Sequence, residues 1–253
     1  MDFLQKNPNE TVYYLADNKN YPYGPRSKEE ITLILITLIE KLLSSSIINP
    51  KIIVLACNTA TIAALTDLRQ RFPQIPFVGT VPAIKPAALA CNNRKVGVLA
   101  TERTIKEMQN LNLADKPCEI FGVAAPELVD FIELHYDDSK KEEKIHAVKR
   151  YIDIFRKANV STIVLGCTHF LFLQEEFRRE AAPNLSVFDS LEGISKRIEF
   201  LLDENNGALR TKTHSNKTEN NKLLLTDSKS INPFWEKRAQ KLKFNFEVIN
   251  YEN

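Results

Sequence analysis

Two segments of this chain share one pattern, which constrains its fold more than any other feature. Val54–Ala60 reads V-L-A-C-N-T-A and Val164–Phe170 reads V-L-G-C-T-H-F. Each is an apolar run that ends in a cysteine and continues into small polar residues suited to a turn. Two cysteines presented alike, from two halves of one chain, suggest a pair of acid–base groups on either side of a substrate.

Strand-like and helix-like segments alternate along the chain, which predicts an α/β fold with mainly parallel sheets. The predicted strands are Thr11–Ala16, Lys51–Ala56, Phe77–Val81, Lys95–Ala100, Ile120–Val123, Ser161–Gly166, Leu185–Asp189, Leu223–Thr226 and Asn245–Ile249. The predicted helices begin after the N-cap Ser27 and continue with Ala60–Arg71, Glu102–Leu111, Lys140–Ala158 and Asn232–Lys241. Ala208–Lys222 is rich in Lys, Asn, Thr and Ser and is interpreted as a solvated loop.

Composition and charge narrow the function classes. A net charge of +2 in 253 residues gives no reason to invoke nucleic acid or a membrane surface. The opening Met1–Pro8 has no basic stretch leading into an apolar one, as a secretory signal would have. Ile31–Leu43 is apolar but too short to span a bilayer, so we interpret it as a core helix. We expect a cytoplasmic protein that binds neither nucleic acid nor membrane.

The four cysteines favour free thiols over disulfides or metal ligands. Disulfide frameworks belong to short secreted chains, and no C-x-x-C or H-x-x-x-H spacing occurs here. Cys91 and Cys118 lack the strand–turn setting and are interpreted as structural. Cys57 and Cys167 lie at predicted strand-to-helix turns, where backbone N–H groups and positive neighbours lower the pKa of a thiol. We therefore expect a thiolate able to act as a general base.

The two halves differ in what precedes their cysteines. The strand that begins at Val96 lies further ahead of Cys167 than Met1 lies ahead of Cys57. If the halves are pseudo-symmetric, the counterpart of that strand falls before Met1. We expect that a first strand–helix unit is missing ahead of Met1, which leaves neighbouring strand edges unpaired.

Beyond the two cysteine motifs, several segments together resemble one enzyme family over essentially the whole chain. They are Y-L-A-D-N-K-N-Y-P-Y-G at Tyr14–Gly24, A-C-N-T-A at Ala56–Ala60, V-P-A-I-K-P-A at Val81–Ala87, V-G-V-L-A-T at Val96–Thr101, L-G-C-T-H at Leu165–His169 and F-D-S at Phe188–Ser190. These motifs resemble those of the glutamate racemases. Related aspartate and hydantoin racemases share the two cysteines, whereas the P-Y-G loop and V-P-A-I-K-P favour the glutamate enzyme.

The resemblance implies two pseudo-symmetric parallel-sheet α/β domains that face each other across a cleft. The first comprises residues 1–91 plus 190–253 and lacks its N-terminal strand, and the second comprises residues 92–189. The implied activity is interconversion of L- and D-glutamate without cofactor or metal, by two cysteine bases, with D-glutamate supplied to peptidoglycan. A homodimer is implied as well. Members of the family also open with a strand and an Asp-Ser-Gly-rich turn that contacts the substrate, and no such segment is found near Met1.

The resemblance assigns roles only to those residues of this chain that match a motif of the family. Cys57 and Cys167 resemble the two catalytic bases. The substrate-binding residues implied by the resemblance are Tyr23, Gly24, Asn58, Thr59, Thr168 and His169. Glu133 aligns loosely with an acidic residue of the family, but we interpret it as solvated or structural rather than catalytic.

Other classes of function stay open at this point. A buried cysteine after a strand is often only a small core residue. A racemase fold without its Asp-Ser turn could serve as a non-catalytic binding protein. A cysteine hydrolase is disfavoured because His169 follows Cys167 by two residues and shares its turn. An aspartate-type racemase is the nearest alternative among enzymes.

Overall fold

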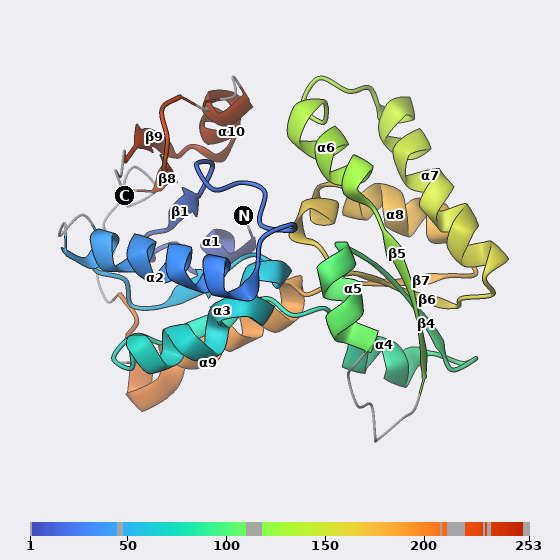
Figure 1. The fold of residues 1–253 in the computed structure, drawn as a ribbon, viewed down its shortest axis with the longest axis horizontal. Helices are drawn as coiled ribbons and strands as arrows, with labels where there is room; N and C mark the ends of the chain where they lie inside the picture. The colour runs from blue at the N-terminus through green and yellow to red at the C-terminus, as the bar shows by residue number, and fades with distance from the viewer. Residues whose placement is uncertain are drawn as a thin grey trace.

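Parallel sheets flanked by helices form the core, which confirms the predicted α/β class (Figure 1). The computed structural model describes residues 2–44, 48–109, 118–207, 209–211, 221–229, 231 and 234–249. Each of the nine predicted strands is present, with ends displaced by at most two residues. The interpreted loop Ala208–Lys222 falls largely outside the described residues, as do the ends of two predicted helices near 110 and 232.

The second half of the molecule is built on one continuous sheet. Its strands lie in the order β5 (Glu119–Ala124), β4 (Lys95–Ala100), β6 (Thr162–Leu165) and β7 (Ser186–Phe188), all parallel. The helices around it are α4 (Ile84–Ala90), α5 (Glu102–Gln109), α6 (Pro126–Leu134), α7 (Lys141–Lys157) and α8 (Gln174–Ala181), the last preceded by a 3₁₀ helix, Thr168–Leu173. Tyr151, Phe155, Phe170 and Phe177 fill the core between this sheet and its helices.

The first half is built on two separate sheets. One has the order β1 (Tyr13–Ala16), β8 (Lys222–Leu225) and β9 (Asn245–Val248), and the other pairs β2 (Ile53–Leu55) with β3 (Phe77–Gly79). Its helices are α1 (Asp2–Lys6), α2 (Lys28–Ser44), α3 (Asn58–Arg71), α9 (Leu191–Gly207) and α10 (Phe234–Leu242). The C-terminal elements β8, α10 and β9 therefore return to the half that contains the N-terminus (Figure 1).

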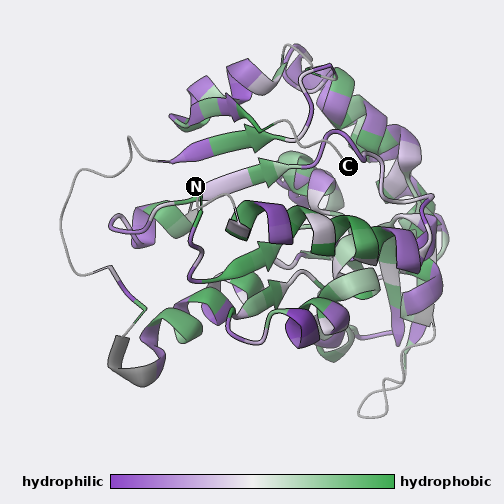
Figure 2. Cartoon of the chain, turned by 60° about the vertical axis from the view of Figure 1, so that its left-hand side comes forward, coloured by the Kyte–Doolittle hydropathy of each residue, from purple (hydrophilic) through white to green (hydrophobic). Residues whose placement is uncertain are grey.

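No strand among the described residues joins β1 to β2. In the second half, β4 pairs with both β5 and β6 and so holds that sheet together. In the first half, β1 pairs only with β8 and β2 only with β3. Figure 2 shows β1 apart from the apolar strands below it, and both tyrosines of β1 are exposed. Among the described residues, β1 and β2 therefore each have one edge without a strand partner, whereas β4 is paired on both sides.

Local sequence signals explain where the helices begin. Ser27 and Glu30 form a reciprocal capping box: the Ser27 hydroxyl accepts from the Glu30 N–H at 3.1 Å, and the Ser27 N–H donates to the Glu30 carboxylate at 2.7 Å. The predicted core helix after Ser27 is α2, which buries Ile31, Leu35 and Leu38. Within the residues that the structure describes, no helix has the length and apolarity needed to cross a membrane.

The domain limits stay a proposal. The return of the chain near residue 190 places α9 against β3 of the first half. Helix α4, which the proposed limits assign to residues 1–91, packs on β4 and β6 through Ile84, Ala87 and Ala88. This helix therefore forms part of the contact between the two halves.

Candidate active site

Both motif cysteines lie in the wall of one large cavity between the two halves. The cavity encloses about 1380 Å³ and is lined on one side by β1 and β2 and on the other by residues of the second half. Cys57, Thr59, Cys167, His169 and Glu133 all line it. The two halves therefore bring together cysteines that are more than a hundred residues apart in the sequence.

Cys57 lies at the N-terminus of α3, as the strand–turn–helix pattern predicts. It is the N-cap residue, and its Sγ accepts from the Ala60 N–H at 3.5 Å. Burial nevertheless raises the pKa of the Cys57 thiol to about 11, because the N–H donors of Ala60 and Thr59 do not offset the lost hydration and Cys167 adds to the rise. The expectation of a lowered pKa at this cysteine is thus wrong. In the resting site Cys57 is a thiol.

Cys167 has a different environment, although its backbone setting is similar. It is the N-cap residue of the 3₁₀ helix, and its Sγ lies 3.6 Å from Nδ1 of His169. Nε2 of His169 in turn lies 2.9 Å from Oε1 of Glu133 on α6. Burial lowers the pKa of His169, but the contacts with Cys167 and Glu133 outweigh burial and raise that pKa to about 10. His169 is therefore an imidazolium that lies between the Cys167 sulfur and the Glu133 carboxylate.

Glu133 is part of this chain of contacts and is not a solvated surface residue. Burial raises the pKa of its carboxyl group, but His169 and Arg238 outweigh burial and keep the pKa below its usual value. The solvated interpretation of Glu133 from sequence is thus wrong, whereas its contacts agree with the structural alternative. Its neighbours on α6 gave no signal, since the contact with His169 depends on how α6 packs against the 3₁₀ helix.

The two cysteine loops are joined by a reciprocal pair of hydrogen bonds. The side-chain amide of Asn58, which follows Cys57, donates to the carbonyl of Gly166, which precedes Cys167. The hydroxyl of Thr168, which follows Cys167, donates to the carbonyl of Ala56, which precedes Cys57, at 3.0 Å. Each loop thus holds the other, so the relative position of the two thiols is fixed by side chains of both motifs.

The remaining polar groups of these motifs differ in their contacts. Oδ1 of Asn58 is buried and has no hydrogen-bond partner among the described residues. Oγ1 of Thr59 lies 3.4 Å from Oγ1 of Thr101 at the end of β4. An unpaired buried acceptor is costly, so Asn58 is held between the two loops at some cost in stability.

The loop before α2 supplies the other expected residues. The Tyr23 hydroxyl donates to Oδ2 of Asp17 at 2.6 Å, and Oδ1 of Asp17 accepts from the Thr226 hydroxyl at 2.7 Å. Tyr23 and Gly24 both line the cavity, and the space around the Gly24 Cα is open. This loop is therefore anchored to β8 through Asp17 and borders the same cavity as the cysteines.

The cysteines and histidines discussed next, which could serve as metal ligands, lie outside the lining of this cavity. Cys91 and Cys118 are free thiols, and Cys91 Sγ contacts Oδ1 of Asn93 at 3.2 Å. His135 and His146 are exposed. Over the described ranges, no three His, Cys, Asp or Glu side chains gather in an arrangement that could hold a metal ion.

Comparison with known proteins gives a consistent family assignment. Residues 4–193 match the family model for Asp/Glu/hydantoin racemase. A glutamate racemase of Clostridium perfringens (strain SM101 / Type A) is 33% identical over 236 residues, which is 90% of this chain and 89% of that protein. A glutamate racemase of Roseiflexus sp. (strain RS-1) is 37% identical over 200 residues, 78% of this chain and 72% of that protein.

Solved structures show the same fold. Escherichia coli glutamate racemase, in complex with L-glutamate and an activator, superposes with a TM-score of 0.80 and 27% identity, covering 100% of this chain and 93% of that chain. The glutamate racemase isoform RacE1 of Bacillus anthracis gives a TM-score of 0.76 at 26% identity, covering 99% of this chain and 91% of that chain. The two-domain arrangement described above matches these neighbours.

Proposed function

The chain belongs to the Asp/Glu/hydantoin racemase family of isomerases, and from this premise we propose that it interconverts L- and D-glutamate with Cys57 and Cys167 as paired bases. The reciprocal hydrogen bonds between the two cysteine loops carry this proposal. They hold two thiols at one cavity with a fixed relative position. Aspartate stays open as a second candidate substrate. It carries the same groups at its reacting α-carbon and differs from glutamate in its shorter side chain.

Racemisation requires groups on opposite faces of the substrate. The Cα–H bond must break on one face, and a new Cα–H bond must form on the other. One base cannot readily serve both faces, so a thiolate and a thiol on opposite sides are needed. We propose that Cys167, beside the His169 imidazolium, supplies the thiolate and that Cys57, with its raised pKa, supplies the thiol.

We propose that one direction of proton transfer starts from this thiolate–thiol pair. The Cys167 thiolate, held by the His169 imidazolium, takes the α-proton from one face. The Cys57 thiol, kept protonated by burial, gives its proton to the other face. The products are the opposite enantiomer, a Cys167 thiol and a Cys57 thiolate. The reverse direction starts from that second state, and proton exchange with solvent interconverts the two states of the enzyme.

The carbanion formed between these steps needs stabilisation within the cavity. Thr59, Asn58 and Thr168 line the same cavity as the two thiols, and we propose that the Thr59 hydroxyl stabilises developing charge on a substrate carboxylate. Asn58 and Thr168 donate to the opposite cysteine loop and so hold this site together. Tyr23 and Gly24 border the same space and are proposed to close over the substrate. No cofactor takes part in this mechanism.

The wider biological role follows from the proposed product. D-glutamate made by this enzyme is proposed to supply peptidoglycan synthesis in the cytoplasm. We propose a homodimer, as in the family that the sequence resembles.

Substrate exchange tests the proposal. The chain is incubated in D₂O with L-glutamate, D-glutamate, L-aspartate or D-aspartate, and NMR follows loss of the α-proton while chiral chromatography follows inversion. We expect exchange and inversion with both glutamate enantiomers and little with aspartate. Exchange with aspartate alone indicates the aspartate-type enzyme, and no exchange with any of the four indicates a binding protein.

A further inference from the structure

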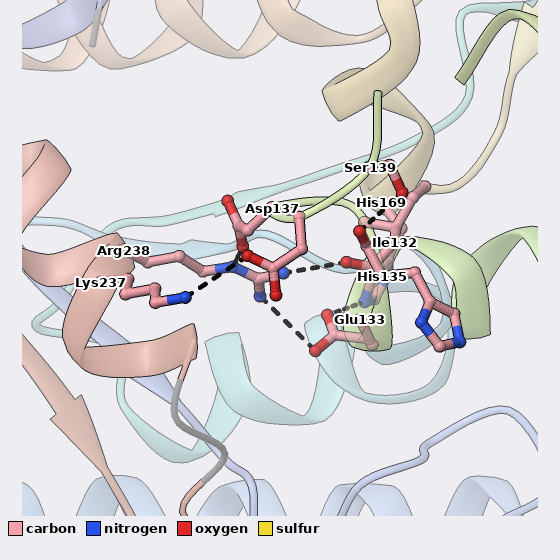
Figure 3. Close-up of polar contacts among 9 residues, drawn as sticks. Ile132, Glu133, His135, Asp137, Ser139, His169, Lys237 and Arg238 are labelled. Atoms are coloured by element: carbon pink, nitrogen blue, oxygen red, sulfur yellow. Dashed lines mark hydrogen bonds and ion pairs between the residues drawn. The ribbon is translucent and has the colours of Figure 1, made fainter. Parts of the chain in front are cut away.

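We infer that Arg238 is a positioning residue that reaches from the C-terminal helix of the first half into the second half and holds Glu133, and through it His169, against Cys167. This inference rests on the proposed function. Its basis is a set of contacts around a single buried guanidinium (Figure 3).

Arg238 is buried and directs its nitrogens to three acceptors near the C-terminal end of α6. Nε donates to Oδ2 of Asp137 at 2.9 Å, and Nη2 donates to the carbonyl of Ile132 at 2.9 Å. Nη1 lies 3.6 Å from Oε2 of Glu133. Only about a tenth of the side chain is exposed. A planar guanidinium suits such divergent acceptors, whereas a lysine ammonium does not.

Glu133 connects this guanidinium with the proton-transfer residues. Its Oε2 faces Arg238, while its Oε1 is 2.9 Å from Nε2 of His169. The other ring nitrogen of His169 faces Cys167 Sγ. The carboxylate is therefore fixed from both sides, which fixes the orientation of the imidazole ring. A histidine that acts on another group through one ring nitrogen is commonly oriented by a second residue bonded to its other ring nitrogen.

The guanidinium also contacts the helix that Cys167 caps. It lies 5.5 Å from the ring centroid of Phe172 in the 3₁₀ helix and 5.5 Å from that of Trp235 on α10. These are cation–π distances. Arg238 thus contacts both segments that carry the relay, α6 and the 3₁₀ helix, although its own helix packs on β8 and β9.

Arg238 belongs to the opposite half of the molecule from the three acceptors that it contacts. Helix α10 belongs to the half that carries Cys57, whereas Glu133, His169 and Cys167 belong to the other. The cation reaches the relay only when the two halves are together. Contact between the halves therefore positions both thiols and completes the support for His169 at the same time.

Single-cysteine backgrounds separate this role from a purely structural one. Arg238→Met is introduced into Cys57→Ala, where only Cys167 exchanges the α-proton, and into Cys167→Ala, where only Cys57 does. In D₂O we expect exchange through Cys167 to fall about tenfold, the effect of one pKa unit, and exchange through Cys57 to stay within about twofold. Arg238→Lys, which keeps the charge, is expected to give an intermediate loss confined to Cys167.

The neighbouring Lys237 provides the matched control. It lies on the same helix and pairs across the halves with Asp138 at 3.4 Å, but its side chain is exposed and the structure shows no contact between it and Glu133 (Figure 3). Lys237→Met is expected to leave both exchange rates unchanged. Equal losses through Cys57 and Cys167 in the Arg238 variants, or no loss in either, would overturn the inference.

A second readout does not depend on catalysis. Alkylation of Cys167 by iodoacetamide is followed at pH 7 by peptide mass spectrometry in the otherwise unchanged chain. Because thiolates are the reactive form, Arg238→Met is expected to slow alkylation of Cys167 about tenfold, while Lys237→Met does not. Unchanged alkylation overturns the inference even if no substrate is exchanged. If no substrate exchanges its α-proton but Arg238→Met alters the alkylation of Cys167, only the proposed function is rejected.

Discussion

The two cysteine-bearing halves follow one chain pattern but differ in two physical respects. The half with Cys167 has a continuous sheet centred on β4, and its cysteine contacts a histidine supported by a carboxylate and a guanidinium. The half with Cys57 has two separate sheets, and the hydrogen bonds to its cysteine come from the N–H groups of Ala60 and Thr59 and from the Thr59 hydroxyl. The same strand–cysteine–helix unit therefore has an imidazolium beside its sulfur in one half and a buried thiol with a raised pKa in the other. The environment of each cysteine, not its motif, distinguishes the two.

The largest expected effect on the rate of racemisation comes from removing the sulfur of either Cys57 or Cys167. We expect Cys57→Ala and Cys167→Ala each to lower the rate of racemisation by about 10²–10⁴-fold, the range for a positioned acid–base group. Polarimetry with D-glutamate measures the rates, and Cys91→Ala is the matched control because its thiol lies outside the cavity lining. A variant of Cys57 that racemises at the unmodified rate would break the proposed pairing.

The discontinuous sheet predicts the next effect. We propose that the groove between β1 and β2 accepts a parallel strand, as β4 occupies the equivalent place in the other half. A copy of the β4 segment Lys95–Thr101, K-V-G-V-L-A-T, fused ahead of Asp2 reproduces the connection between β4 and α5. Fully buried aliphatic side chains each contribute about 1.5–3 kcal/mol before ordering costs, so we expect a rise in Tm of about 5 °C or more.

The control for the fused strand is a Gly-Ser segment of the same length. It adds the same number of residues without apolar side chains and is expected to leave the Tm unchanged. An equal Tm for the two fusions would show that the groove does not bind a strand and that the comparison of the two sheets has no energetic consequence.

The histidine next to Cys167 predicts a smaller and one-sided effect. His169→Gln removes the imidazolium that stabilises the Cys167 thiolate. We expect α-proton exchange in the Cys57→Ala background to fall about 10–100-fold, as one to two pKa units imply, and exchange in the Cys167→Ala background to change far less. His146→Gln, on an exposed residue, is the control. Equal losses in both backgrounds would contradict the different roles of the two halves.

The same histidine gives the stability of the protein a pH dependence. The pKa of His169 is raised from 6.5 to about 10 in the folded state, so the folded state holds its proton more tightly. Its contribution to stability is complete below pH 6.5 and is lost as the pH rises through 10. From pH 7 to 9, we expect the free energy of unfolding to fall more steeply in the unmodified chain than in His169→Gln. Urea denaturation at several pH values measures it, and parallel profiles would contradict the assigned imidazolium.

The smallest predicted effect concerns the hydrogen bonds that join the loops. Thr168→Val removes the donor to the Ala56 carbonyl and is expected to cost about 0.5–1.5 kcal/mol of stability. Thr66→Val, on an exposed position of α3, is the matched control. A loss in the control as large as that in Thr168→Val would indicate that the cross-loop bond contributes nothing specific.

Much of the fold could be predicted because its signals are local. The apolar run before Cys57, the capping box at Ser27 and the amphipathic pattern after Lys140 each depend on neighbouring residues, and the strands and helices that they predict are present. Internal symmetry also predicted where strand edges are unpaired. By contrast, α6 and α9 were not predicted.

The candidate site could be predicted only in part, because its chemistry depends on long-range packing. The cysteines and His169 were identified from motifs, but Glu133 takes its role from contacts with a helix more than a hundred residues away. The protonation state of Cys57 depends on burial by both halves, which no local pattern encodes. Arg238 gave no sequence signal at all, since a basic residue beside Lys237 on a short amphipathic helix is typical of a solvated surface.

The most direct measurement is the stereochemistry of α-proton exchange in the two single-cysteine variants. In D₂O, Cys57→Ala and Cys167→Ala are each supplied separately with L- and D-glutamate, and NMR follows the α-proton. If the thiols face opposite sides of the substrate, each variant exchanges only one enantiomer, and the two variants select opposite enantiomers. Exchange of the same enantiomer by both variants would place the two thiols on one face and contradict the paired mechanism.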